Sequence, residues 1–497
     1  MSNRCLKYSF IIIGAISVII PIIGSFFYSH LHVDSSILLS EVERVYEGYV
    51  PYIEMHLNYP PLWFYLMTGL KWIFNVSYGC YNFYLFVHYL FVIGNMLCIF
   101  YLSQRFAFSK TISILCAWVF FVMSHWLHGN CVLFEMPSIF MGLLSCGLLM
   151  TKNENKWFVL LAGFFGCFSF LIKQFGAGFF ALAILLVIFF KEKQKLQSIA
   201  IYILGYFIPL LVCFLLFREN FINSVLFNGY GTSVSPNVNN SFIEHIPYMM
   251  ERFFYFCYRI FPLFIISICI PFFTHKSKQI KIFVFSICGI LGFMLQFFFI
   301  SWVGQGVLHY YIYCVPFAAI MTGLICDVVN KYTTSKKLFF WGGVKLAVLL
   351  IVTFSIIPSV YSTYYNRVYK LYYKKFQDKD GHIEFAKKVG NMIKDENSTI
   401  FVTDASEGVV YYINNLLPPN MLEVGYSNGA NEMTEERAYL QATTADYILY
   451  VLPTNYPDPI YISPRIKEHL SKLPYDTISI GEYQHHLYKQ LSHEIIN

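Results

Sequence analysis

The most informative shortage in this sequence is charge. Asp, Glu, Lys and Arg make up only 13% of the 497 residues, whereas about a quarter of a soluble globular protein is charged. Hydrophobic residues make up 57% and aromatic residues 20%, and the mean hydropathy is +0.53. So little charge cannot cover the surface of a water-soluble protein of this length. The composition excludes an ordinary soluble protein and predicts one that is surrounded mostly by lipid.

Several chemical motifs are also absent. The chain has no phosphate-binding P-loop, no G-x-G-x-x-G segment after a strand, and no basic surface suited to nucleic acid. Its 13 cysteines are scattered through or beside apolar stretches, with no C-x-x-C pair and no metal-ligand spacing. We therefore expect no nucleic-acid partner and no nucleotide site of these kinds, and we interpret the cysteines as buried free thiols.

Long apolar runs are what the chain has in abundance. Each is close to the length that a helix needs to cross a hydrocarbon core about 30 Å thick. The pattern predicts an all-α polytopic membrane protein with about eleven transmembrane helices. The first run lacks a small-residue cleavage site and is interpreted as a retained helix rather than a signal peptide. The runs are Tyr8–Tyr28, Tyr81–Ser103, Ile112–Trp126, Met136–Met150, Trp157–Ile172, Phe175–Phe190, Ile199–Phe217, Phe253–Phe273, Ile282–Ile300, His309–Cys326 and Leu338–Val360.

The composition changes near Asn366. From there to the end, 13 Lys and Arg face 17 Asp and Glu, whereas the preceding part holds 22 and 12. Short alternating runs are interleaved with helical ones, which predicts a small α/β domain. We therefore expect a transmembrane domain over residues 1–365, with an exterior loop at 29–79 that carries juxtamembrane helices, and an α/β domain over 366–497. The expected strands are Thr399–Thr403, Tyr447–Leu452 and Thr477–Ile480, and the expected helices are Ile383–Lys394 and Arg465–Leu473.

The orientation follows from the positive-inside rule. Arg4 and Lys7 precede the first run, which places the N-terminus in the cytoplasm and the loop at 29–79 outside. Pro60–Asn75 is apolar but short and contains Lys71. If it crossed the membrane, most Lys and Arg of the later turns would lie outside, against the rule. We predict that it is an exterior surface or re-entrant helix, and that the C-terminal domain is also extracytoplasmic.

The exterior loop carries the acid of greatest interest, Asp34. The segment Ser35–Glu47 after it predicts an amphipathic helix that ends at Gly48. Asp34 alone has two interpretations, an N-cap for this helix or a general base held just above the membrane. The other acids of the helix are predicted to form a solvated face: Glu41, Glu43 and Glu47.

The wording around this helix resembles a known family. An acid after the first span, then "EGYVPY" and "YPPLWFYL", is similar to the first exterior loop of the GT-C glycosyltransferases, in the branch of protein O-mannosyltransferases and the bacterial aminoarabinose transferase of lipid A. Where the family has Asp-Glu, this chain has Asp34-Ser35. The resemblance implies that Asp34 is the catalytic acid, and that Glu135 is a second acid opening a later helix. Glu135 alone fits a first-turn acid stabilised by the helix dipole equally well.

Further candidates lie at the exterior ends of later runs. We expect the donor phosphate to be bound by Lys173, Arg259, Arg252 and His309, and the substrate pocket to include Tyr59, Tyr255, Tyr310 and Tyr311. Arginine forks suit phosphate oxygens, and the family has a similar lysine-containing turn. Lipid contacts are the competing interpretation: Lys173 reaching the headgroups, Arg252 touching them, and the tyrosines forming an interfacial belt.

The function predicted from these features is sugar transfer. The chain would move a sugar from a polyprenyl-phosphate-linked donor to an extracytoplasmic lipid, glycan or protein, by inverting displacement with Asp34 as the base. No nucleotide cofactor is required, and the assistance of a divalent metal is left open. The composition favours a bacterial inner membrane. The alternatives are a polytopic transporter or lipid and polysaccharide flippase, and a non-catalytic assembly or receptor protein.

Overall fold

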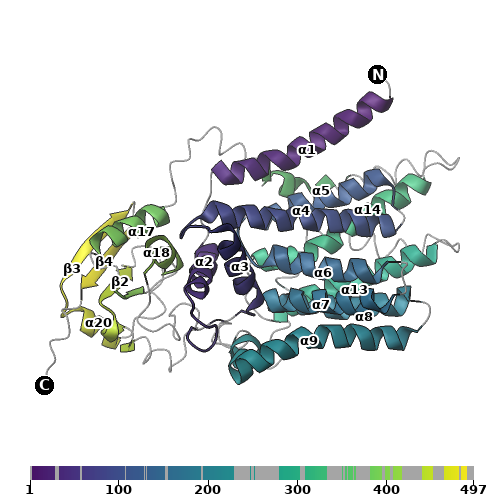
Figure 1. Ribbon diagram of the computed structural model, residues 1–497. Coiled ribbons are helices and arrows are strands. Elements are labelled where there is room, and N and C mark those ends of the chain that lie inside the picture. The colour runs from purple at the N-terminus through teal and green to yellow at the C-terminus, as the bar shows by residue number, and fades with distance from the viewer. Residues whose placement is uncertain are drawn as a thin grey trace. The chain divides into compact units, whose positions relative to one another are not determined.

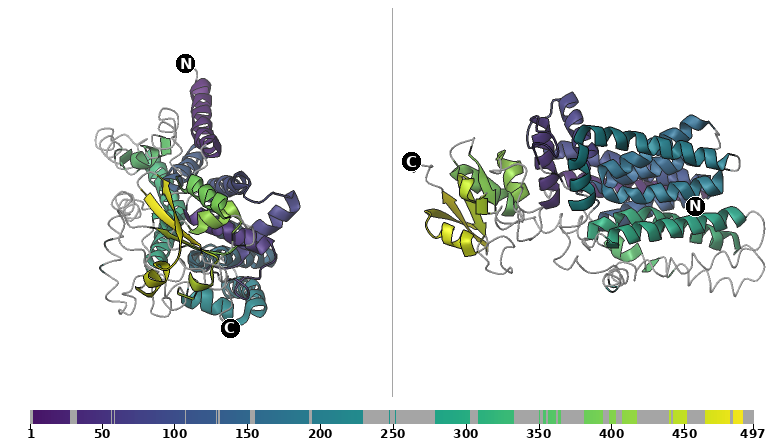
Figure 2. Two further views of the ribbon diagram at one scale, coloured as in Figure 1. Left: turned by 90° about the vertical axis from the view of Figure 1, so that its left-hand side faces the viewer. Right: turned by 90° about the horizontal axis from the view of Figure 1, so that it is seen from below.

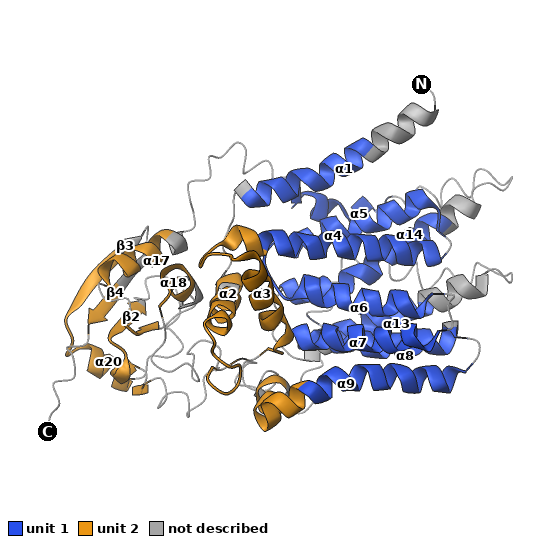
Figure 3. Cartoon of the chain, viewed as in Figure 1, with its two compact units in different colours: residues 1–29, 85–212, 241–375 blue, residues 30–84, 213–240, 376–497 orange. Residues whose placement is uncertain are grey.

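The computed structural model describes most of the chain in two compact units. The described residues are 3–27, 33–228, 247, 251, 279–302, 308–332, pieces of 350–364, 381–393, 398–402, 407–416, 439–451, 464–480 and 483–489, with gaps at 56, 58, 107, 128, 130, 152–154, 192–193 and 441. The first unit comprises Met1–Ser29, Leu85–Val212 and Ser241–Lys375, and the second comprises His30–Tyr84, Cys213–Asn240 and Phe376–Asn497 (Figure 3).

The first unit consists of long apolar helices that run alongside one another (Figures 1 and 2). Each predicted run that the structure describes in full forms a helix, whereas Phe253–Phe273 and most of Leu338–Val360 lie outside the described residues. Side-chain caps start two of the helices: Ser109 accepts from the N–H of Ile112, and Asn155 from that of Trp157. The helices are α1 (Asn3–Phe27), α4 (Tyr81–Arg105), α5 (Lys110–Trp126), α6 (Glu135–Leu149), α7 (Lys156–Ile172), α8 (Ala177–Phe190), α9 (Lys195–Ile222), α13 (Gln279–Trp302) and α14 (Val315–Tyr332).

Length and composition allow part of this set to cross a membrane. Among the described residues, three helices are long and apolar enough, at Tyr81–Arg105, Lys195–Val225 and His309–Asp327, and shorter apolar helices accompany them. Large apolar side chains of α1 and α9 are exposed, including Ile13 and Leu215, as lipid-facing positions would be. None of the ten cysteines whose side chains the structure describes forms a disulfide, and six of the ten are buried.

Close approach of backbones positions α7 against α9. A Cβ on Gly163 would overlap the carbonyl oxygen of Tyr202, and one on Gly205 would overlap that of Leu160. Small residues that let backbones meet are the common device for packing helices in lipid, where apolar burial between helices contributes little. This crossing therefore depends on the absence of two side chains.

The second unit begins with two helices from the predicted exterior loop, α2 (Val33–Tyr46) and α3 (Leu62–Phe74). The 13 residues of α3 extend about 20 Å, too short for a hydrocarbon core about 30 Å thick. α3 packs against α2, and Asn75 ends it in a left-handed conformation. This length agrees with the prediction that Pro60–Asn75 does not form a span.

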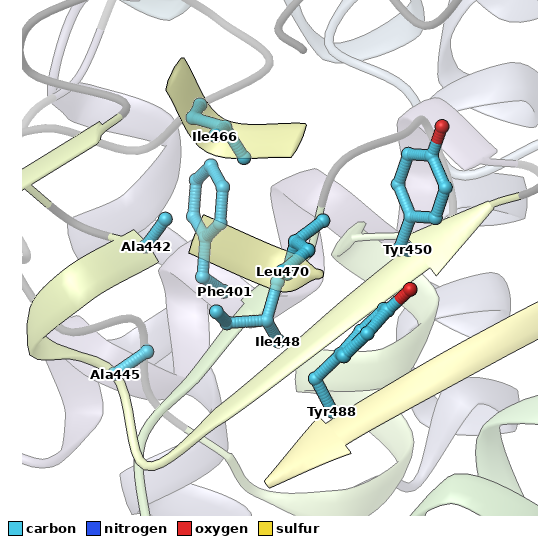
Figure 4. Packing of buried hydrophobic residues seen from close by; sticks show 8 residues of the cluster. All are labelled: Phe401, Ala442, Ala445, Ile448, Tyr450, Ile466, Leu470 and Tyr488. Atoms are coloured by element: carbon cyan, nitrogen blue, oxygen red, sulfur yellow. The ribbon is translucent and has the colours of Figure 1, made fainter. Parts of the chain in front are cut away.

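The C-terminal part of this unit is a small α/β arrangement. Its strands are β1 (Ile400–Val402), β2 (Tyr447–Val451), β3 (Tyr475–Ile480) and β4 (Tyr483–Lys489), in the order β1-β2-β4-β3, with β1 parallel to β2 and the other pairs antiparallel. The helices are α17 (Gly381–Met392), α18 (Glu407–Asn414) and α20 (Pro464–Leu470). Ile448 and Phe401 pack with Ile466 and Leu470 of α20 in the core (Figure 4). The sequence predicted the first three strands but missed β4 and α18.

The glycine contact predicts a stability difference. Gly205→Ala places a methyl group against the Leu160 carbonyl and should lower the free energy of unfolding by roughly 1–3 kcal/mol. Gly289→Ala in α13 is the matched control, because a Cβ there meets nothing within 4 Å. Thermal unfolding of the purified protein in detergent measures both. Equal melting temperatures for the two variants would contradict the tight crossing.

Candidate functional site

A buried acid lies at the start of α6. Glu135 is the first residue of this helix, and its side chain is completely buried. The free N–H groups and the dipole at a helix start both favour a carboxylate. Lys173 follows the last residue of α7, and its ammonium donates to Oε1 of Glu135. The fold thus joins opposite charges from two helices inside the first unit.

Aromatic rings surround the ammonium of Lys173. Its Nζ lies 4.2 Å from the ring centre of Tyr310, 5.5 Å from that of Phe175 and 5.6 Å from that of Phe134. The residue is only 3% exposed. The side chain is therefore held inside the protein by an ion pair and cation–π contacts. This burial does not fit the interpretation that Lys173 reaches the lipid headgroups.

His309 and Tyr310 complete the cluster from a 3₁₀ segment, η3 (Leu308–Cys314), that leads into α14. His309 Nε2 is 3.8 Å from Oε1 of Glu135, and its ring centre is 4.5 Å from that of Tyr310. Tyr310 in turn meets Phe175 edge to face at 4.9 Å. The sequence singled out Glu135, Lys173, His309 and Tyr310 separately, and the structure brings them together.

The cluster retains unused bonding capacity. Oε2 of Glu135 has no hydrogen-bond partner among the described residues, although it is buried. A hydroxyl of a bound molecule can donate to it, which would satisfy an otherwise costly acceptor. If His309 is protonated, the three ionisable groups carry a net charge of about +1 and favour an anion such as a phosphate.

Two other candidates have different surroundings. Tyr311 is also buried in the first unit, and its ring stacks on Phe297 of α13 at 5.8 Å. Tyr59 belongs to the second unit, where its carbonyl accepts a hydrogen bond from the hydroxyl of Tyr52. Three predicted residues, Arg252, Tyr255 and Arg259, lie outside the described residues.

Asp34 lies within the first turn of α2. The helix begins at Val33, so Asp34 is its second residue rather than the residue before it. Only its backbone position is described. A residue inside the helix is not its N-cap, so this backbone position does not fit the N-cap interpretation of Asp34.

The solvated acidic face predicted for α2 is wrong for two of its three acids. Glu43 is 2% exposed and Glu41 is 8% exposed, whereas Glu47, just beyond the helix, is exposed. Glu43 accepts from the ammonium of Lys71 in α3 and, at 2.9 Å, from the hydroxyl of Tyr84. Because α2 is enclosed on most sides, amphipathic periodicity gave the wrong answer. A lysine inside an apolar segment was the available signal that a buried acid lay nearby.

The described residues offer no metal centre. No group of three or more His, Cys, Asp or Glu side chains within them is close enough to hold an ion. The buried carboxylates of Glu43 and Glu135 are paired with lysines, which compete with a cation for the same oxygens. We therefore derive no step through a metal.

The Glu135–Lys173 pair yields a prediction about stability. Lys173→Met leaves a buried carboxylate unpaired and should lower the free energy of unfolding by roughly 3–5 kcal/mol. The double variant Glu135→Gln/Lys173→Met should recover most of that loss. Lys156→Met, at the exposed beginning of the same helix, is the control and should change little. Thermal unfolding in detergent tests this, and equal effects of the single and double variants would contradict the pairing.

Comparison with known proteins identifies the fold. No family model and no curated protein matches the sequence. ArnT from Cupriavidus metallidurans, solved bound to undecaprenyl phosphate, is 10% identical with a TM-score of 0.61, covering 97% of this chain and 98% of that one, and its apo structure gives the same values. The apo oligosaccharyltransferase of Archaeoglobus fulgidus is 12% identical with a TM-score of 0.52, covering 88% and 70%. Both neighbours are GT-C membrane glycosyltransferases. With its apolar helices, the chain is an integral membrane protein, and it has the GT-C fold.

Proposed function

We propose that this protein is a membrane glycosyltransferase that takes a sugar from a polyprenyl-phosphate-linked donor and transfers it to an extracytoplasmic lipid, glycan or protein. The observation that carries the proposal is the buried cluster of Glu135, Lys173 and His309 in a chain with the GT-C fold. Fold alone leaves function open. The cluster supports it because it combines a cation for phosphate with a carboxylate that can still accept a hydrogen bond.

The donor phosphate would meet Lys173 and His309. An ammonium held by rings and one carboxylate is shielded from water, so its attraction to an arriving phosphate is stronger than at a surface. The phosphate would draw Lys173 partly away from Glu135, whose carboxylate then accepts from a sugar hydroxyl. Arg252 and Arg259 are proposed as further phosphate ligands from their sequence, and Tyr59, Tyr255, Tyr310 and Tyr311 as walls of the pocket.

Asp34 is proposed as the general base. Its carboxylate would take the proton from the acceptor hydroxyl while that oxygen forms a bond to the anomeric carbon. The bond from this carbon to the phosphate oxygen breaks in the same step, and polyprenyl phosphate leaves with the electron pair. Attack opposite the leaving group inverts the anomeric configuration. Positive charge around the phosphate stabilises the charge that develops on the leaving oxygen.

The proposed location follows from the same residues. The charge distribution supports a cytoplasmic N-terminus, which puts α2, α3 and the C-terminal sheet on the extracytoplasmic side of a bacterial inner membrane. A lipid-linked donor suits that side because its tail stays in the bilayer and no nucleotide is required there.

Replacing Asp34 tests the proposal. Asp34→Asn keeps the size of the side chain but removes the base, and turnover should fall roughly 10²–10⁴-fold. The measurement is release of polyprenyl phosphate when detergent-purified protein is mixed with a panel of polyprenyl-phosphate sugars and acceptors. Glu47→Gln, just beyond the end of α2 and exposed, is the matched control and should keep normal turnover.

Near-normal turnover in Asp34→Asn would remove Asp34 as the base. If no donor in the panel is consumed, while vesicles containing the protein move a lipid-linked sugar across the bilayer, a flippase replaces the transferase.

A further inference from the structure

The helix that carries Asp34 is held by the C-terminal part of the chain. Within the second unit, α18 packs against α2, although more than 360 residues separate them in sequence. Tyr411 of α18 lies under the guanidinium of Arg44, whose Cζ is 5.2 Å from the ring centre. The Tyr78 hydroxyl donates to the backbone carbonyl of Tyr411 at 3.1 Å. The Tyr411 hydroxyl donates to the carbonyl of Ile400 at 2.9 Å, which ties the contact to β1.

A second set of contacts lies under the same end of α2. Glu43 uses both carboxylate oxygens, accepting from Tyr84 with Oε1 and from Lys71 with Oε2. The ammonium of Lys71 also lies 4.1 Å from the ring centre of Tyr46 and 5.4 Å from that of Tyr78. Tyr78 therefore belongs to both sets of contacts. Its ring centre is also 6.1 Å from that of Tyr412, the residue after Tyr411 in α18.

The tyrosine hydroxyls in these contacts remain donors. Burial, followed by the charge of Glu43, raises the pKa of the hydroxyls of both Tyr78 and Tyr412 far above the usual value. Both stay protonated at any physiological pH, so the hydrogen bond from Tyr78 to Tyr411 persists. Arg44 is 4% exposed, and its Nη2 has no hydrogen-bond partner among the described residues, which gives the cation–π contact more weight.

Stability alone is a poor explanation for so many buried charges. Removing two charges from water costs several kcal/mol per ion, and apolar residues of similar volume often stabilise a protein as well or better. What an ion pair adds is a defined orientation of the two groups that it joins. A helix packed only by apolar side chains can rotate or slide, and one residue of register turns it by about 100°. The Glu43–Lys71–Tyr84 contacts and the Arg44–Tyr411 contact each allow one rotation of α2.

We propose that the C-terminal segment positions α2, with Glu43, Lys71, Tyr78 and Tyr411 acting as positioning residues for the acid at the other end of the helix. α2 is a single helix from Val33 to Tyr46, so fixing the rotation at Glu43 and Arg44 also fixes the backbone position of Asp34. This inference rests on the proposed function for its effect on turnover, but not for its effect on the helix.

The main test removes the ion pair without leaving a lone charge. Glu43→Gln/Lys71→Met is expected to lower kcat roughly ten- to a hundred-fold, the range for a misplaced catalytic group, while KM for the lipid-linked donor stays unchanged. Hydrogen exchange of the peptide 33–46 in the full-length protein should become faster. A purely structural role would instead lower the melting temperature without this split between kcat and KM.

The matched control is an ion pair in the same unit that touches neither set of contacts. Glu468 and Lys472 pair at 2.9 Å, with side chains 70% and 67% exposed. Glu468→Gln/Lys472→Met makes the same chemical change at the surface, and it should leave kcat and the exchange of 33–46 as in the unchanged protein.

If the double variant does not fold, a single substitution that removes less tests the positioning role. Tyr78→Phe removes only the hydrogen bond to the Tyr411 carbonyl and should lower kcat roughly two- to ten-fold, the fold-change for one such bond. Unchanged kcat and unchanged exchange in a folded variant, with Asp34→Asn inactive, would overturn the positioning role and leave the proposed function standing. If the unchanged protein transfers no sugar, the proposed function fails, and the exchange of 33–46 alone decides: faster exchange supports positioning, and unchanged exchange overturns it.

Discussion

The rest of this structure depends on one constraint, which is that a charge buried away from water needs a partner. A lone buried ion is too costly to persist, so each must find an opposite charge or several hydrogen bonds. Two buried lysines show this: Lys173 pairs with Glu135 and Lys71 pairs with Glu43. Each pair joins two helices that follow one another in the chain, namely α6 with α7 and α2 with α3. Satisfying charge thereby determines which helix ends meet.

The apolar helices of the first unit and the short helix α3 could be predicted because a helix that crosses a bilayer needs a long run of apolar residues. A run of apolar residues either reaches across the bilayer or does not, and α3 with 13 residues does not. The strands β1, β2 and β3 were predictable for a similar reason, since alternation marks a half-buried strand. The residues of the candidate site could also be predicted in part. Ionisable residues are rare near lipid, and this criterion selected Glu135, Lys173 and His309.

What the sequence could not supply was the pairing of distant elements. Glu43 was predicted to face water because charge on a helix usually does, but α18 and α3 enclose that face. No sequence pattern within α18 or α2 predicts the contact between these two helices. The strand β4 was missed because Tyr483–Lys489 carries two histidines and little apolar alternation, and its partners β2 and β3 decide its conformation. Long-range packing overrides local preference in each case.

The two acid–lysine pairs differ in one respect that separates their roles. Glu43 has both carboxylate oxygens engaged, by Lys71 and by Tyr84, and these contacts hold its helix. Glu135 uses Oε1 toward Lys173 and His309, while Oε2 has no hydrogen-bond partner among the described residues. A buried acceptor without a partner destabilises the protein, and a hydroxyl that donates to it removes this destabilisation. The completed pair therefore suits positioning, and the incomplete one suits binding.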